Sequence, residues 1–167
     1  MMDIRLFEEG DWSGVWGILE PVFRAGETYA FSTDITEQEA HRVWVELPAA
    51  TFVVTGGPGE VLGTYYLKAN QPGPGSHVCN CGYVVAEHAR GRGIATRMCR
   101  HSQQEALSRG FLCMQFNLVV STNEVAVRLW KREGFETVGT LPGAYRHARL
   151  GYVDAFVMYK KLEGALS

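Results

Sequence analysis

The residues with the clearest capacity for chemistry lie in the short stretch Arg90-Gly-Arg-Gly93, near the middle of the chain. Apolar residues precede it at 83–85, and apolar residues at helical i, i+4 spacing follow it over 94–106. A strand, a tight glycine turn and the start of a helix form an anion site, because the first N–H groups of a helix have no intrahelical partner. The glycines allow close backbone approach, and the arginines suit phosphate. We therefore expect a phosphate-containing ligand here.

Three phosphate sites compete for this stretch. A P-loop needs G-x-x-x-x-G-K-[ST], which the chain lacks. A dinucleotide-binding turn needs G-x-G-x-x-G, and Thr96 stands where its third glycine belongs. The third pattern, [Q/R]-x-x-G-x-[G/A], is matched at every position by Arg90-Gly-Arg-Gly93-Ile-Ala95. The stretch therefore resembles the pyrophosphate loop of the GNAT acyltransferases, and an ordinary glycine-containing strand–helix turn is the alternative without function.

A second motif follows over residues 121–135. Ser121 and Glu124 have the spacing of a capping box, and Gly134 stands where a helix C-terminal cap belongs. The stretch resembles the second GNAT motif, N-x-x-A-x-x-L-Y-x-x-x-G-F, except that Trp130 replaces the usual Tyr. Together the two motifs cover residues 82–135, and the chain is identified as a suspected member of the GNAT N-acetyltransferase superfamily.

Composition predicts one ordinary domain over residues 1–167, since the chain is 46% hydrophobic and 20% charged. A net charge of −2 gives no general basic field for nucleic acid or an anionic membrane. No run of about 18 apolar residues suggests a membrane span, and residues 1–9 lack the features of a signal peptide. We expect a cytoplasmic protein.

Patterning predicts an α/β (α+β) fold with helices on both faces of a mixed, mostly antiparallel sheet. Asp11 is expected to cap a first helix that Pro21 kinks or splits, and a second helix should run from near Thr36 to Pro48. Strands are expected at 3–7, 51–55, 61–69, 77–85, 111–120, 135–140 and 151–161, with loops at 71–76 and 141–149.

The resemblance implies a GNAT fold with about seven strands and a V-shaped splay between the fourth and fifth strands. Gly82 inside the fourth strand suggests a bulge or a close backbone approach, and GNAT proteins typically have a bulge there.

The resemblance also implies acetyl-CoA as the co-substrate. The backbone of Tyr83 and Val85 should hold the pantetheine by strand-like pairing. The N–H groups of residues 92–95 should bind the pyrophosphate, Asn123 should contact the cofactor arm, and the Val85 N–H should polarise the thioester carbonyl. The expected cofactor-binding set is Tyr83, Val84, Val85, Arg90, Gly91, Arg92, Gly93, Ile94, Ala95, Thr96, Asn123, Ala126 and Trp130.

Acid and base catalysts are harder to identify. An indole N–H donates a hydrogen bond but does not release a proton, so Trp130 cannot replace the family's thiolate-protonating Tyr. The fourth strand has no Asp or Glu between His77 and Val85. We favour a base that acts through ordered water, with Glu27 and Tyr145 as catalytic candidates. His77 at the start of the fourth strand is a further possible base, and Tyr29, Asn117 and Asp154 are candidates for the acceptor side.

His77, Cys79 and Cys81 alternate along one strand and invite a metal interpretation. Residues at i and i+2 of a strand lie roughly 6.5–7 Å apart, whereas zinc bonds measure about 2.0–2.3 Å. One straight strand therefore does not readily bring three ligands to one ion. We expect no metal, and nothing requires disulfides among the cysteines.

The preferred function is transfer of an acetyl group from acetyl-CoA to the primary amine of a small molecule, such as an amino acid, a polyamine or a drug, by direct attack in a ternary complex. The alternatives are acetylation of a protein N-terminus or lysine, a non-catalytic acyl-CoA-binding domain, and a nicotinamide-dependent enzyme. The resemblance also makes a homodimer through the last strands possible.

Overall fold

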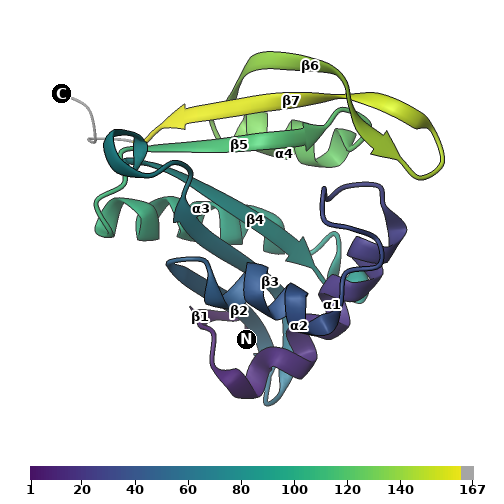
Figure 1. Cartoon of the computed structure of the whole chain (residues 1–167). Coiled ribbons are helices and arrows are strands. Elements are labelled where there is room, and N and C mark those ends of the chain that lie inside the picture. The colour runs from purple at the N-terminus through teal and green to yellow at the C-terminus, as the bar shows by residue number, and fades with distance from the viewer. Residues whose placement is uncertain (163–167) are drawn as a thin grey trace.

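The computed structural model describes residues 1–162 as a single seven-stranded sheet with helices on both faces (Figure 1). Its strand order is β1-β2-β3-β4-β5-β7-β6, with β4 and β5 as the parallel pair among antiparallel neighbours. The strands are β1 (Asp3–Leu6), β2 (Ala50–Gly57), β3 (Glu60–Ala69), β4 (Val78–Val85), β5 (Cys113–Val120), β6 (Glu136–His147) and β7 (Gly151–Lys161). The predicted fold class is confirmed.

Each face of the sheet has its own hydrophobic core. The helices α1 (Trp12–Ala25) and α2 (Glu37–His41) cover one face, where Leu19 and Phe23 are buried beside Trp44. The helices α3 (Ile94–Ser108) and α4 (Glu124–Arg132) cover the other, where Met98 and Trp130 are buried. The sheet is therefore packed on both of its faces.

The splay between the fourth and fifth strands is confirmed by the register of the sheet. The strands β4 and β5 pair only at Val78 with Cys113 and at Cys79 with Met114. Beyond these pairs β4 continues along β3, whereas β5 continues along β7 with a register shift between Phe116 and Val119. The irregularity therefore lies in β5, where it turns the strand away from β4.

Gly82 marks a close approach rather than a bulge, because the pairing of β3 with β4 runs through it without a shift. Gly82 is opposite Tyr66, and a Cβ at Gly82 would lie 2.5 Å from the Tyr66 ring. The ring of Tyr66 also meets Trp44 edge to face at 4.8 Å between centroids. Only glycine leaves room for this aromatic side chain to cross the strand.

Two predicted helix caps were wrong. Asn123, not Ser121, is the N-cap of α4, and its side chain accepts a hydrogen bond from the Ala126 N–H. Asp11 does not cap α1 with its side chain, which instead accepts from Arg5 and from the Glu8 N–H. A carboxylate that already binds a guanidinium and a backbone N–H has little capacity left to cap a further helix.

Pro21 does not split α1, which runs unbroken from Trp12 to Ala25. Leu19 and Phe23 are buried on either side of it, so tertiary packing holds the helix where proline removes one hydrogen bond. The second helix is shorter than predicted: α2 ends at His41, and a π-helical turn continues to Glu46.

The predicted loop at 141–149 was wrong for most of its length, because β6 continues to His147. The strand pairs with β7 on both sides of a register shift between Leu141 and Tyr145. The Gly143 N–H in this interruption donates to the Asp154 carboxylate at 2.9 Å. Pro142 and Gly143 are typical of turns, so the sequence does not indicate a strand here. The Asp154 side chain from β7 stabilises the irregular turn.

Candidate functional site

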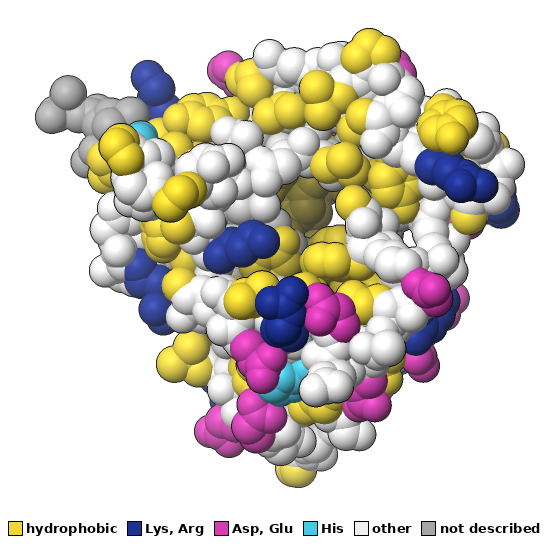
Figure 2. Space-filling model, viewed as in Figure 1, with side chains coloured by type: hydrophobic (Ala, Val, Ile, Leu, Met, Phe, Trp, Pro, Cys, Tyr) yellow, Lys and Arg dark blue, Asp and Glu magenta, His cyan; other side chains and the backbone are white. Residues whose placement is uncertain are grey.

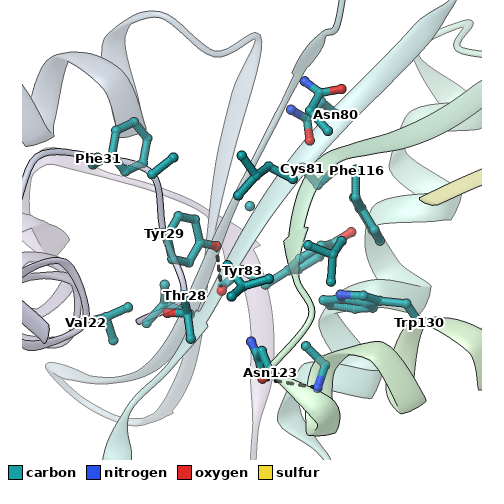
Figure 3. Close-up of a pocket in the computed structure, with 18 of the residues that line it drawn as sticks. Val22, Thr28, Tyr29, Phe31, Asn80, Cys81, Tyr83, Phe116, Asn123 and Trp130 are labelled. Atoms are coloured by element: carbon teal, nitrogen blue, oxygen red, sulfur yellow. Dashed lines mark hydrogen bonds between the residues drawn. The ribbon is translucent and has the colours of Figure 1, made fainter. Parts of the chain in front are cut away.

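A pocket of about 570 Å³ occupies the gap between β4 and β5. It is bordered by the loop between α1 and α2 and by the start of α4, and it appears as a hollow lined with hydrophobic side chains in Figure 2. Tyr29 and Phe31 approach it from the loop, and Phe116 and Trp130 lie on the opposite side (Figure 3). Asn80 and Asn123 lie toward opposite ends of it. The volume is in the range of small-molecule sites.

The backbone of β4 supplies polar groups to this pocket. The Ala86 N–H donates to Leu62 O and the Asn70 N–H donates to Val78 O, so the even-numbered residues of β4 bond to β3. By strand alternation, the backbone groups of Cys81, Tyr83 and Val85 face the gap. The phenol of Tyr83 points away from it, into the core against Ser102 at 2.6 Å between the oxygens. Tyr83 thus contributes its backbone, not its side chain.

Tyr29 already uses one of these backbone groups. Its hydroxyl donates a 2.8 Å hydrogen bond to the Tyr83 carbonyl (Figure 3). Burial raises the pKa of Tyr29 well above its ordinary value, so the hydroxyl stays a donor at neutral pH. The Cys81, Tyr83 and Val85 N–H groups are the donors that strand alternation directs toward the gap.

The loop that carries Tyr29 is bonded to the β6–β7 hairpin at three points. The Tyr145 hydroxyl donates to the Tyr29 carbonyl at 2.9 Å, and the Ala148 N–H donates to Gly26 O at 3.0 Å. The Arg149 guanidinium pairs with Glu27 at 2.7 Å. We call these three contacts the clasp. It joins two segments far apart in the sequence, one of which lines the pocket at Thr28–Phe31.

The predicted anion site lies at the start of α3. Gly91 and Gly93 have φ of 78° and 76°, a region that favours glycine. The Arg97 N–H makes the first backbone bond of the helix, to Gly93 O, so the N–H groups of residues 94–96 precede the helical ladder. Arg90 lines the pocket and Arg92 is exposed, whereas Arg97 turns toward the Met2 carbonyl. These residues can hold a phosphate group.

The α4 side of the pocket combines a helix cap with aromatic packing. The Asn123 side chain accepts from the Ala126 N–H at 3.4 Å, and both residues line the pocket. The indole of Trp130 packs 5.0 Å from the Tyr83 ring and 4.9 Å from the Phe116 ring between centroids. Trp130 is therefore held as a wall, with 9% of its surface exposed.

The structure separates the predicted acceptor-side residues. Asn117 and Tyr29 line the pocket, whereas Glu27 and Tyr145 lie behind the pocket-lining loop, in the clasp. Asp154 binds the Gly143 N–H as described, and His77 is exposed immediately before β4.

Sequence reasoning missed Asn80, Phe31 and Tyr66 among the lining residues. Asn80 could have been found from strand alternation, since it shares one face of β4 with Gly82 and Val84. Strand alternation alone does not mark Asn80 as a pocket residue, because the position of the gap beside β4 must also be known.

The four cysteines lie in the interior of the protein. All four cysteines are free and buried, and burial raises the pKa of Cys99 to about 11. Over residues 1–162, no three His, Cys, Asp or Glu side chains are grouped closely enough to hold a metal ion. Within the same range, no helix has the length and apolar character needed to cross a membrane.

The sequence matches the Acetyltransferase (GNAT) family over residues 12–135. The chain belongs to this family. The predicted family is thereby confirmed, together with the N-acetyltransferase class that it represents.

One curated relative of this GNAT chain is N-acetyltransferase aca1 of Schizosaccharomyces pombe, 38% identical over 110 residues. The match covers 64% of this chain and 53% of the relative, so the chain spans about half the length of that protein.

Solved structures share the whole fold. A GCN5-related N-acetyltransferase from Kribbella flavida is 38% identical with a TM-score of 0.91, covering 96% of this chain and 98% of the other. The yncA structure from Salmonella typhimurium, described with its cofactor acetyl-CoA, is 18% identical with a TM-score of 0.82, covering 100% and 97%. At that identity the likeness shows the fold alone.

Proposed function

We propose that this GNAT domain, spanning residues 1–167, transfers the acetyl group of acetyl-CoA to the primary amine of a small molecule by direct attack in a ternary complex. The observation that carries the proposal is the early end of β4–β5 pairing at Cys79 and Met114. It leaves unpaired backbone groups beside a pocket that includes Arg90, close to the glycine turn at the start of α3. The acetyl-CoA described for the yncA structure supports the choice of ligand.

The residues present fit acetyl-CoA along its length. The Tyr83 and Val85 backbone would pair with the pantetheine as a further strand would. The N–H groups of residues 92–95 would bind the pyrophosphate, with Arg90 and Arg92 as charged partners. The other expected cofactor-binding residues, among them Val84, Thr96, Ala126 and Trp130, are also proposed to contact acetyl-CoA. When bound, acetyl-CoA supplies an activated acetyl thioester.

Catalysis by this chain rests mainly on positioning and on one backbone donor. The Val85 N–H faces the gap and is proposed to stabilise the negative charge that develops on the thioester oxygen. The pocket walls hold the two reactants in contact, which removes much of the entropic barrier. Ordered water is proposed to take the amine proton, because no acidic side chain lines the pocket among the described residues. Trp130 serves as a wall.

Glu27 and Tyr145 are proposed to act through the clasp. Tyr145 fixes the backbone of Tyr29, and Glu27 fixes Arg149 of the hairpin. Both residues thereby position the tyrosine that faces the pocket. A role in proton transfer would require the side chain of Glu27 or Tyr145 to reach the pocket. Their hydrogen bonds to Arg149 and to the Tyr29 carbonyl hold both side chains in the clasp instead.

A small acceptor is favoured over a protein because the loop that the clasp holds lines the pocket and narrows its opening. An extended peptide needs an open groove, whereas a small amine needs only the hollow. The free cysteines suit the reducing conditions of the cytoplasm, which is the proposed compartment. A homodimer through β6 and β7 is also proposed, since Val138 and Tyr152 of these strands are 59% and 75% exposed.

Release of CoA thiol in the presence of amines tests the proposal. The panel should contain free amino acids, spermidine, a lysine peptide and a peptide with a free N-terminus. The expected result is thiol release that needs a small amine and saturates with it. Binding of acetyl-CoA without turnover of any amine would favour the non-catalytic alternative, and turnover of the peptides alone would favour a protein acceptor.

A further inference from the structure

The pocket proposed to hold the acceptor has an unusual charge balance. Of the described residues that line the pocket, none is Asp or Glu, and the charged one is Arg90, assigned above to phosphate. A site built to hold a polycationic amine would be expected to supply carboxylates. The lining here is aromatic and amide-bearing instead, so the acceptor must be recognised by something other than its positive charge.

One cation lies next to the end of the pocket that Asn80 marks. Lys68 is on β3, two residues from Tyr66 and therefore on the same face of the sheet. Its ammonium lies 5.2 Å from the centre of the Tyr66 ring, and Tyr66 lines the pocket. Among residues 1–162, no carboxylate pairs with Lys68, which is only half-buried. A partly desolvated ammonium beside a pocket attracts an anion.

Lys68 faces an amide across the sheet. It is in register with Asn80 on β4, and directly opposed residues have Cβ atoms about 4.5–5.5 Å apart. Asn80 lines the pocket, and within the described part of the chain its side chain has no recorded hydrogen-bond partner. A carboxamide with free N–H donors beside an ammonium can bind a carboxylate through both groups.

A second set of amides borders the same end and is already fixed. The Asn117 amide donates to Asn70 at 2.7 Å and accepts from Gln115 at 2.9 Å. Asn117 also lines the pocket. Because these amides bind one another, their geometry is set before any ligand arrives, and Asn80 is the amide left for the ligand.

We propose that the acceptor is a small amine that carries a carboxylate, as an amino acid does, and that Lys68 and Asn80 bind this carboxylate. This inference rests on the proposed function. The acceptor's amine then points along the pocket toward the backbone of Tyr83 and Val85. Aromatic rings of Tyr29, Phe31 and Tyr66 would enclose the part of the acceptor between its two polar groups.

The step balances without further reactants. The neutral amine nitrogen forms a bond to the thioester carbonyl carbon, and the carbon–sulfur bond breaks. One proton leaves the nitrogen and one proton joins the departing thiolate, which gives an N-acetylated acid and free CoA thiol. The carboxylate is unchanged and stays on Lys68 throughout. Among the described residues, no carboxylate lines the pocket to stabilise the ammonium form of the amine, which favours the reactive neutral form.

The test compares matched acceptors on the full chain. Alanine, methionine and phenylalanine are each assayed for CoA thiol release against their own carboxamides, with spermidine and an alanine-led peptide alongside. The expected result is a kcat/KM for the free acids roughly tenfold to a hundredfold above that for the carboxamides, the usual effect of hydrogen bonds to a charged group. Spermidine and the peptide should be poorer acceptors than the free acids.

Two variants locate the effect. Lys68→Gln should raise KM for the free acid roughly tenfold and narrow its advantage over the carboxamide, with the dissociation constant for acetyl-CoA unchanged. Lys161→Gln removes an exposed lysine at the end of β7 and should change neither value. Equal or better turnover of carboxamides, spermidine or the peptide would overturn the inference, as would an unchanged KM in Lys68→Gln.

Acetyl-CoA binding and amino-acid acetylation distinguish a failure of the proposed cofactor site from a failure of the proposed acceptor. If acetyl-CoA does not raise the melting temperature of the folded wild type, the cofactor site of the proposed function fails. If acetyl-CoA stabilises the protein but no free amino acid is acetylated, the carboxylate-bearing acceptor is wrong while the cofactor site stands.

Discussion

The hydroxyl of Tyr29 lies 2.8 Å from the backbone carbonyl of Tyr83, a residue 54 positions away in the sequence, and donates a hydrogen bond to it. This bond ties the loop between α1 and α2 to the strand that borders the pocket. The Tyr145 hydroxyl holds the same residue from behind, through the Tyr29 carbonyl. The pocket wall on this side therefore depends on two consecutive hydrogen bonds, one from the Tyr145 hydroxyl to Tyr29 and one from the Tyr29 hydroxyl to Tyr83.

Tyr29→Phe removes the first of these bonds and keeps the ring. Because one partly buried hydrogen bond is lost, the free energy of unfolding should fall by about 0.5–1.5 kcal/mol. Acceptor KM should rise while acetyl-CoA affinity changes little, since the loop borders the acceptor end. Denaturant melts and steady-state kinetics measure both effects.

Tyr145→Phe serves as the partner in a double-mutant cycle with Tyr29→Phe. If the clasp positions Tyr29, the two substitutions should be non-additive, because each weakens the same loop. Fully additive effects on acceptor KM would show that Tyr145 does not act through Tyr29.

Trp130→Phe and Trp130→Tyr form a matched pair that differs by one hydroxyl. Both lose indole contacts with Tyr83 and Phe116, so both should be destabilised, by roughly 1–3 kcal/mol. If Trp130 is only a wall, the two variants should have the same kcat. A kcat for the Tyr variant several times that of the Phe variant would instead show that a proton donor is limiting at this position.

Protonation of His101 should weaken the fold at mildly acidic pH. Burial lowers the pKa of His101 from its ordinary 6.5, against a smaller opposing effect from Glu105. The unfolded chain therefore binds this proton at higher pH than the folded chain does. The contribution to stability is complete above about pH 6.5 and is lost as the pH falls through the lower folded value.

His101→Gln tests this, because glutamine can still accept from the Tyr65 hydroxyl, which lies 2.7 Å from His101 Nδ1. Between pH 7.5 and pH 5, wild type should lose more stability than this variant. His77→Gln, at an exposed position, is the control and should follow wild type. An identical loss in wild type and His101→Gln would rule out the assignment.

The sequence was sufficient for the fold class and for the local form of its two motifs, for a physical reason. Arg90 to Ala95 and residues 121–135 are contiguous motifs, and local glycine turns and helix caps determine their geometry. The strands could be predicted where apolar and polar residues alternate, because one face of such a strand is buried.

The acceptor end depends on long-range contacts that leave little local pattern. Glu27 and Tyr145 attracted attention by residue type, but their partners, Arg149 and the Tyr29 carbonyl, lie more than 100 positions away. Lys68 and Asn80 are opposed only because β3 and β4 pair in that register. The extension of β6 past Pro142 was missed because Asp154 supports its irregular turn from another strand.

The most direct test of the account is thermal unfolding with and without excess acetyl-CoA, on wild type, Gly93→Val and Gly151→Val. Both glycines have a φ of 76° and open surroundings, so valine should strain each backbone by a similar amount, about 1–2 kcal/mol. Gly93 opens α3 at the proposed pyrophosphate site, whereas Gly151 begins β7.

At about 100 times its dissociation constant, acetyl-CoA should stabilise wild type and Gly151→Val by about 2.7 kcal/mol and leave Gly93→Val unchanged. A folded wild type that acetyl-CoA does not stabilise, or an equal stabilisation of Gly93→Val, would contradict the account.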